Sequence, residues 1–343
     1  MGKKTEVGAA RRGDFEKKTF FERTPVVFFG AMVCCALWGS AFPCIKIGYR
    51  MFAIGAEDTA AQILFAGVRF FLAGILVIAM GGFKPRSTKM SENSERAEYA
   101  GGYRLLLPKK GSWIRILKLS ALQTIAQYLF FYIGLAHTTG VKASIVEGLN
   151  VFVAIFVSGL VFHMEKITAG KVIGSVIGFL GVILVNLTGE KGNLSVSLLG
   201  DGFVFLSTVA YAFSSVLMKR YGKYDNPVLL SGYQFLVGGF VMAGVGLLMG
   251  GRLPMVGMPQ LLMLLYLAVV SAAAYTLWGI LVTHNPISKV AVFGFMNPVF
   301  GVILSAWLLP KDSGLRIWSL PALLLVCAGI CIVNTTGQKT EMN

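Results

Sequence analysis

The chain has 343 residues, of which 55% are hydrophobic and 14% are charged, and its mean hydropathy is +0.71. A soluble protein of this length cannot bury so much apolar surface, so the composition excludes an ordinary globular domain and indicates a membrane protein. The formal net charge of +15 would suggest nucleic-acid binding in a soluble chain. In a membrane protein the placement of the cations matters more than their sum, and we expect no nucleic-acid partner.

Apolar runs, taken in chain order, predict ten membrane-spanning helices. A span needs about 20 mainly apolar residues. The predicted spans are 26–46, 59–80, 113–135, 142–162, 168–187, 198–220, 228–250, 259–283, 288–309 and 315–335. A basic tail (1–25) precedes them and a short tail (336–343) follows, so we predict an all-α membrane protein embedded in a lipid bilayer.

Lysines and arginines collect in the N-terminal tail and in the polar loop 83–112, which follows the second span. With ten spans, a cytoplasmic N-terminus places both basic segments and the C-terminus on the cytoplasmic side, in agreement with the positive-inside rule. We therefore expect a multi-pass protein of the cell (plasma or inner) membrane with both termini in the cytoplasm. Binding of anionic lipid headgroups is an alternative role for the same segments.

Residues 26–187 and 198–335 are predicted to be two copies of one unit, because polar residues and glycines recur in matching order. The corresponding pairs are Trp38 and Tyr211, Gly67 and Gly232, Gly74 and Gly239, Tyr128 and Tyr275, His137 and His284, Lys142 and Lys289, Asn150 and Asn297, and Gly181 and Gly329. Each unit holds five predicted spans, so the second copy must enter the membrane from the opposite side. The fold class is thus ten transmembrane helices formed by two inverted five-helix repeats, an architecture of many secondary transporters.

Three motifs resemble the EamA-type unit of the drug/metabolite transporter superfamily. The first span reads ALWGSAFPCIKIG, the second carries GVRFFLAG, and the fourth begins GVKASIVEGLN. The resemblance covers both units and implies ten helices, cytoplasmic termini, and export or exchange of amino acids or related metabolites. The second unit departs from the pattern, because Gln234 stands where Arg69 would be and Asp312 follows Lys311 where Gly-Glu is usual.

Polar side chains inside the spans are candidates for a substrate site, because a polar group facing lipid is costly. The fourth and ninth spans carry matching stripes at helical spacing: Glu147, Asn150, Ala154 and Ser158, and Gly294, Asn297, Gly301 and Ser305. Close helix packing is the alternative explanation for the small residues. For Asn150 and Asn297 the pattern leaves both a cavity-lining and a structural role open.

Glu147 is the acidic residue that lies well inside a predicted span, and burial penalises a charged carboxylate. This placement suggests proton coupling, with Arg69 in the second span as the expected ion-pair partner. A buried Arg–Glu pair with a purely structural role is the alternative.

Aromatic and amide side chains complete the predicted substrate site, since they suit a small polar solute with an apolar part. The candidates are Trp38, Ser40, Gln123, Gln127, Tyr128, Tyr211, Tyr275 and Trp278. Packing or anchoring at the membrane interface is the alternative for the aromatic residues. Pro43 and Pro298 are candidate hinges or static kinks, because each removes a backbone hydrogen bond.

The glycine face formed by Gly170, Gly174 and Gly178 indicates either packing within the unit or a homodimer contact. All five cysteines lie in predicted spans without CxxC spacing, and the histidines show no zinc-ligand spacing. We therefore predict no metal and no cofactor.

The sequence predicts a secondary transporter and not an enzyme. No phosphate-binding GxxxxGK[ST] loop is present, which argues against an ATP-driven pump. We expect a small-molecule substrate moved by alternating access, with export as the expected direction. The alternatives are a membrane receptor or assembly protein without transport activity, and an exchanger of nucleotide sugars or other organic anions from the same superfamily.

Overall fold

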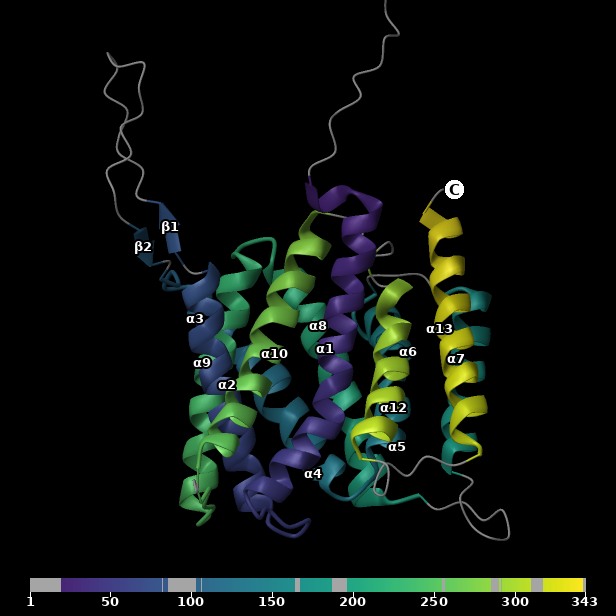
Figure 1. Cartoon of the computed structure of the whole chain (residues 1–343). Helices are drawn as coiled ribbons and strands as arrows, with labels where there is room; N and C mark the ends of the chain where they lie inside the picture. Colours follow the sequence, from purple (N-terminus) through teal and green to yellow (C-terminus); the bar gives the residue numbers. More distant parts are fainter. Residues whose placement is uncertain are drawn as a thin grey trace, which may run out of the picture.

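The computed structural model describes residues 20–81, 83–85, 103–105, 107–163, 167–186, 196–254, 257–284, 290, 292–309 and 317–341. The predicted repeat partners Lys289 and Asp312, and most of the 83–112 loop, lie outside the described residues. The described chain is a bundle of helices that run roughly side by side (Figure 1).

The elements follow the order of the predicted spans. The first half contains η1 (Phe20–Glu22), α1 (Thr24–Met51), α2 (Thr59–Gly81), β1 (Phe83–Pro85), β2 (Tyr103–Leu105), α3 (Ser112–Leu119), η2 (Ser120–Ala126), α4 (Gln127–Ala136), α5 (Gly140–Glu147), α6 (Asn150–Phe156), η3 (Val157–Val161) and α7 (Ala169–Asn186). The second half contains η4 (Leu198–Gly202), α8 (Phe203–Tyr221), α9 (Pro227–Leu248), α10 (Met258–His284), η5 (Val292–Phe295), α12 (Met296–Leu308) and α13 (Ser319–Glu341). The segments η2, η3 and η4 are π-helical turns.

Seven helical stretches in the described part of the chain are long and apolar enough to cross a membrane. They are Thr24–Met51, Thr59–Gly81, Ser112–Ala136, Gly140–Val161, Leu198–Tyr221, Val228–Leu248 and Met258–Trp278. The fifth, ninth and tenth predicted spans contain the shorter apolar helices Ala169–Leu184, Met296–Leu308 and Ser319–Ile332. The protein is therefore a multi-pass membrane protein of helical architecture.

Large apolar side chains cover the outside of the bundle, where they would face lipid. Phe29 is 66% exposed, Leu248 90%, Trp307 74% and Leu320 60%. In water such a surface would be strongly unfavourable, whereas hydrocarbon tails solvate it well. The outer surface thus agrees with the composition of the chain.

Side chains at the helix starts supply partners for backbone N–H groups that the helix itself leaves unpaired. The hydroxyl of Thr139 accepts a hydrogen bond from the backbone N of Lys142 at 3.2 Å, where α5 begins. The side chain of Asn226 accepts one from the backbone N of Val228 at 2.9 Å, and Pro227 occupies the first turn of α9. These residues set where two of the helices enter the bundle.

The two ends of the bundle can be told apart by the chain ends (Figure 1). The helix α1 begins at the end where α13 finishes, and α3 and the β1–β2 ribbon lie at that end as well. We call it the termini end. The α1–α2 turn and the α4–α5 turn lie at the other end, which we call the opposite end.

The helices α2 and α9 approach so closely that only glycine fits at their contact. A Cβ on Gly239 would lie 2.8 Å from the carbonyl oxygen of Gly67, and a Cβ on Gly74 would lie 2.9 Å from that of Gly232. Glycine permits this backbone approach because it has no side chain. The two contacts are related, since Gly67 corresponds to Gly232 and Gly74 to Gly239 in the predicted repeats.

The helices α7 and α13 form a second closely packed pair, and its two glycine contacts also correspond to each other in the predicted repeats. A Cβ on Gly181 would lie 2.6 Å from the carbonyl oxygen of Ala322, and a Cβ on Gly329 would clash with that of Gly174. A Cβ on Gly178 would meet the ring of Phe152 on α6. Two glycines of the predicted GxxxGxxxG face therefore pack within the chain.

The structure differs from the expected spans at three places. The fourth span is broken by a turn at Gly148 and Leu149, so the predicted stripe from Glu147 to Ser158 does not lie on one continuous helix. A Cβ on Gly148 would lie 2.8 Å from Val326, which shows that the turn packs against α13. The ninth span begins as the 3-10 turn η5 before α12, and α13 continues to Glu341, through most of the predicted C-terminal tail.

The predicted cytoplasmic loop begins and ends in a short antiparallel ribbon. Phe83 pairs with Leu105, Lys84 with Arg104, and Pro85 with Tyr103. The ribbon brings the two ends of the loop together beside α3 (Figure 1).

Candidate functional site

The carboxyl group of Glu147 lies inside the bundle at the C-terminal end of α5. The residue is 8% exposed. Its Oε2 accepts a hydrogen bond from the hydroxyl of Ser207 on α8 at 3.2 Å, and the side chain of Asn150 on α6 lies beside it. Because Ser207 belongs to the second half of the chain, this contact joins the two halves.

Tyr128 on α4 and Tyr275 on α10 meet through their hydroxyl groups, which lie 2.7 Å apart. The ring centroid of Phe70 is 4.0 Å from that of Tyr128, and the ring centroid of Phe235 is 4.9 Å from that of Tyr275. Tyr128 and Tyr275 are equivalent in the predicted repeats, so the two halves touch here through the same residue of each.

The side chains of Tyr128, Tyr211 and Tyr275 lie close enough to Glu147 to interact with it electrostatically. The tyrosine hydroxyls and the carboxylate come from α4, α5, α8 and α10. We call this group the central cluster; its members are Tyr128, Glu147, Asn150, Ser207, Tyr211 and Tyr275. The structure thus brings five of the predicted site residues together, and adds Ser207.

Arg69 does not contact Glu147 in the described part of the chain, so the predicted ion pair is wrong. Arg69 is 3% exposed, and its guanidinium donates to the carbonyl oxygen of Leu267 at 3.1 Å, the hydroxyl of Tyr132 at 2.6 Å and the hydroxyl of Ser271 at 2.9 Å. The physical reason is that all three nitrogens of the guanidinium already have acceptors on α4 and α10. Arg69 therefore fastens α2 to both of these helices.

Gln123 and Gln234 form a buried amide pair between η2 and α9. The Nε2 of Gln234 donates to the Oε1 of Gln123 at 2.7 Å, and the hydroxyl of Thr124 donates to the backbone carbonyl oxygen of Gln234 at 3.3 Å. Gln123 is thus committed to a helix contact. The Oε1 atoms of Gln127 and Gln234 are buried and have no hydrogen-bond partner among the described residues.

Trp38 lies beside the central cluster. Its ring centroid is 5.5 Å from that of Tyr275 and 5.2 Å from that of Trp278, so the three side chains form a continuous aromatic surface between α1 and α10. The indole Nε1 of Trp38 and the Oδ1 of Asn297 are buried without a partner in the described part of the chain. A donor and an acceptor that are both unpaired are available to a polar ligand.

Ser40 and the two prolines are not members of the central cluster. The Ser40 hydroxyl donates to the carbonyl oxygen of Leu37 at 2.7 Å and lies 2.8 Å from the hydroxyl of Tyr266. Pro43 is buried inside α1, whereas Pro298 lies in the first turn of α12, where a missing N–H costs little. The predicted hinge role remains a prediction for both prolines.

Two grooves lie at the edge of the bundle. One of about 370 Å³ is formed mainly by η1 and α1, and one of about 460 Å³ by α2, the end of α9 and α10. Both are lined mainly by apolar side chains. They are suited to lipid tails and do not include any residue of the central cluster.

The comparison with known protein families decides the class of the protein. The EamA-like transporter family matches residues 26–187 and 198–335. The chain belongs to the EamA-like transporter family. This EamA-like chain is therefore a membrane transporter, and its family indicates no catalytic function.

Relatives of this EamA-like chain are found in bacteria, archaea and a plant. The chain is 26% identical over 309 residues to the uncharacterized transporter YvbV of Bacillus subtilis, which covers 89% of this chain and 90% of YvbV. It is 27% identical over 281 residues to an uncharacterized transporter of Archaeoglobus fulgidus, covering 80% and 86%. It is 25% identical over 285 residues to the uncharacterized inner membrane transporter YedA of Escherichia coli K12, covering 82% of each.

A solved crystal structure has a similar fold. The match has a TM-score of 0.58 and 16% sequence identity, and it covers 92% of this EamA-like chain and 99% of the other. At this identity the match shows the fold alone.

Sequence reasoning missed Ser207, Tyr132 and Ser271, each of which binds a predicted site residue. Serine and tyrosine are common in apolar spans, and their contacts join residues between 60 and 202 positions apart. Equivalence between the repeats is the signal that points to Ser271. Ser271 corresponds to Thr124, and Arg69 corresponds to Gln234. Ser271 contacts Arg69, and Thr124 contacts Gln234.

Proposed function

We propose that this chain is a gradient-driven carrier that moves a small metabolite by alternating access through ten spans. Its two halves are inverted repeats, and the substrate binds at the central cluster between them. Seven long and three shorter apolar helices support the number of spans. The termini lie in the cytoplasm of a cell whose plasma or inner membrane holds the protein.

The observation that carries the proposal is the pairing of equivalent residues across the bundle. If Gly67 contacts Gly239, a twofold relation between the halves requires that Gly232 contacts Gly74, and both contacts occur. The pairs formed by Gly181 with Ala322 and by Gly329 with Gly174 obey the same relation, as does the contact of Tyr128 with Tyr275. A central twofold relation lets two inverted halves exchange shapes around one site.

The chemistry of the central cluster favours a small substrate with both a polar group and an apolar part. Glu147 offers a carboxylate, and the neighbouring Trp38 offers an indole N–H that has no partner among the described residues. The rings of Tyr275 and Trp278 offer an apolar surface beside these groups. Amino acids or related compounds fit this combination, and we propose export as the direction.

The termini end is the proposed cytoplasmic end. The basic N-terminal tail precedes α1 at this end, and the basic loop 83–112 leaves and re-enters the bundle there through the β1–β2 ribbon (Figure 1). The positive-inside rule then supports cytoplasmic termini.

Purified protein in lipid vesicles tests the proposal. Vesicles loaded with a mixture of unlabelled amino acids should take up labelled amino acids by exchange, and an imposed pH gradient should increase the rate. Glu147→Gln should abolish the pH-driven part while the protein still inserts, because the variant cannot release a proton. Glu57→Gln is the matched control, since Glu57 is 92% exposed, and it should behave as the wild type. Equal pH-driven rates in Glu147→Gln and wild type would refute proton coupling.

Exchange of organic anions is a second candidate, favoured by Arg69. Its guanidinium is buried, and the partners that the structure gives it are neutral oxygen atoms and the rings of Phe70 and Tyr132, none of which carries a negative charge. An uncompensated buried cation attracts an anionic group. If added organic anions reduce the uptake of the labelled substrate and added amino acids do not, this candidate is favoured over the first.

A further inference from the structure

Asp201 in η4 is buried at the opposite end of the bundle and is held by contacts from the other half of the chain. It is 5% exposed. One carboxylate oxygen accepts a hydrogen bond from the hydroxyl of Thr138 at 2.7 Å, and the other lies 2.9 Å from the Nζ of Lys142. The backbone N of Ser197 adds a hydrogen bond of 3.1 Å from the same half as Asp201.

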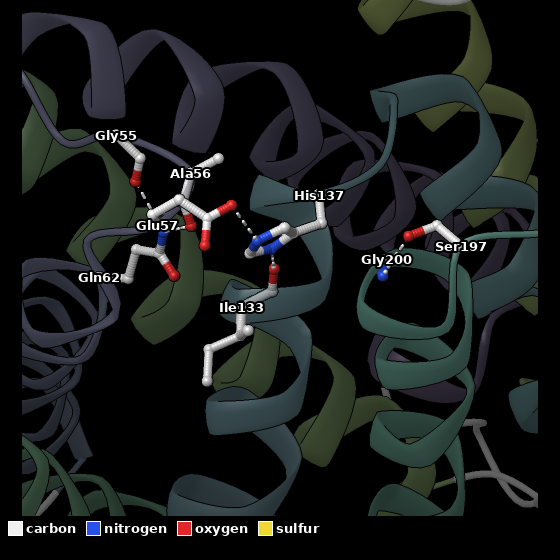
Figure 2. A network of polar contacts seen from close by, with 8 residues as sticks. All are labelled: Gly55, Ala56, Glu57, Gln62, Ile133, His137, Ser197 and Gly200. Atoms are coloured by element: carbon white, nitrogen blue, oxygen red, sulfur yellow. Dashed lines mark hydrogen bonds and ion pairs between the residues drawn. The ribbon is translucent and has the colours of Figure 1, made fainter.

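The two halves are packed tightly around this contact. A Cβ on Gly200 would lie 2.6 Å from the carbonyl oxygen of His137. Figure 2 shows the end of α4 at His137 beside Gly200 of η4 and Ser197, which caps that turn. In the same view His137 reaches Glu57 of the α1–α2 turn, 3.5 Å away. Movement of η4 away from the α4–α5 turn would therefore break the contacts of Asp201 with Thr138 and Lys142.

Asp225 forms a comparable contact at the termini end, where α3 begins. Its side chain is 7% exposed. One carboxylate oxygen accepts a hydrogen bond from the hydroxyl of Ser112 at 2.6 Å, and the other accepts one from the Nε of Arg115, also at 2.6 Å. The guanidinium of Arg115 lies 5.6 Å from the ring centroid of Tyr224. Here too the acid belongs to the second half and its partners to the first.

The two contacts are not copies of each other. In the repeat alignment that pairs Trp38 with Tyr211, the position equivalent to Asp201 is Phe28. In the alignment that pairs Tyr128 with Tyr275, the position equivalent to Arg115 is Leu262. Duplication of the unit therefore does not explain why an acid of the second half pairs with a base of the first half at each end.

We propose that Asp201 and Asp225 are latches that close the two ends of the transport path, and that each opens only while the other remains closed. The proposal rests on the alternating-access function proposed above. Opening the opposite end separates the buried carboxylate of Asp201 from Lys142, which is costly. Opening the termini end breaks the partly exposed pair of Asp225 with Arg115. A state with both ends open would lose both contacts, so the two latches disfavour an open leak through the protein.

Side-specific labelling tests the proposal. A cysteine replaces Asn150 as a reporter in a chain whose five native cysteines are changed to alanine, and a membrane-impermeant thiol reagent is added to either face of sealed vesicles. Asp201→Asn should increase the labelling rate several-fold from the face of the α1–α2 turn only. Asp225→Asn should increase it several-fold from the other face only.

Matched variants separate a latch from a loss of structure. Asp58→Asn makes the same chemical change at the opposite end and is the control. Asp58 accepts its hydrogen bond from Ala61 of the adjoining helix α2, within the same half of the chain. This variant should leave the labelling rates from both faces unchanged. The charge-swapped variant Lys142→Asp with Asp201→Lys should return labelling to the reporter-chain rate. Thr138→Val removes one hydrogen bond to Asp201 and should give a smaller increase in labelling rate from the same face as Asp201→Asn. It replaces Asp201→Asn in the test if that variant does not fold.

Two results would overturn the latches. One is an increase in labelling that is equal from both faces in either variant, and the other is an increase no larger than that of Asp58→Asn. Exchange transport by wild-type protein is measured in parallel. If the wild type transports but the variants label equally from both faces, the latches are refuted and the carrier function stands. If the variants label from one face only but the wild type does not transport, gated ends are supported and the carrier function is refuted.

Discussion

The hydroxyl contact between Tyr128 and Tyr275 joins the two halves of the protein in its interior. Tyr128→Phe leaves the hydroxyl of Tyr275 without this partner, and an unpaired buried polar group costs about 1–3 kcal/mol. We expect the free energy of unfolding in detergent to fall by about that amount. The double variant with Tyr275→Phe should recover much of the loss, because no unpaired hydroxyl remains. Additive losses from the two substitutions would show that the contact is not direct.

Asp225 makes the stability of the protein depend on pH. Burial by itself would raise the pKa of Asp225, but hydrogen bonds from Arg115 and Ser112 and the charge of Arg115 lower the pKa below its ordinary value. A carboxyl group with a lower pKa in the folded state stabilises the fold at neutral pH, and this contribution is lost as the pH falls through the lowered value.

Wild type should therefore melt at a higher temperature than Asp225→Asn at pH 7. The difference should shrink in acid, below about pH 4, where the carboxylate becomes protonated. Thermal unfolding of both proteins across this range measures the effect. A difference that stays constant with pH would mean that the charge of Asp225 contributes nothing.

The sequence predicted several members of the central cluster, but it did not predict their contacts; that they bind substrate stays a prediction. Glu147 and Tyr128 stand out because polar residues are rare in apolar spans, and both are in the central cluster. The pairing of Glu147 with Arg69 was wrong, because a pattern along the chain does not show which way a long side chain points. The actual partner of Glu147, Ser207, lies on another helix, and a serine in a span carries no distinctive signal.

At the scale of helices, the close approach of α2 and α9 depends on the absence of side chains at glycines of both helices, among them Gly67, Gly74, Gly239 and Gly246. A Cβ on Gly74 would lie 2.5 Å from the backbone N of Leu236, and neither backbone can move without separating the helices. We expect Gly74→Ala to lower the free energy of unfolding by about 1–3 kcal/mol. Gly244→Ala on α9 is the matched control, because a Cβ there meets nothing within 4 Å. Similar losses for the two variants would contradict the packing.

The helical stretches themselves follow closely from the apolar runs, since seven predicted spans are long helices in the structure. The breaks within them were not predicted. The turn at Gly148 packs against Val326 of α13, and the π-helical turns η2 and η3 interrupt predicted spans without any proline to mark the break. Such irregularities arise from contacts with other helices, which hydropathy along one span does not record.

For the whole molecule, equivalence between the halves was the most informative feature of the sequence. It related the glycines of α2 to those of α9 before any contact was known, and the structure places Gly67 against Gly239 and Gly74 against Gly232, two contacts that the predicted equivalence exchanges. Membership of the EamA-like transporter family then assigns the molecule to membrane transport. Substrate and direction depend on the few groups around Glu147, and these remain proposals.

The central claim is that the two halves cross the membrane in opposite senses, so that equivalent turns face opposite sides. The α1–α2 turn and the α8–α9 turn are equivalent, and each exposes a suitable residue, Ala56 and Lys223. The test is to label a single cysteine at each position with an impermeant thiol reagent, in sealed vesicles of one orientation. We predict that Ala56→Cys is labelled from one face and Lys223→Cys from the other, and labelling of both from the same face would contradict the account.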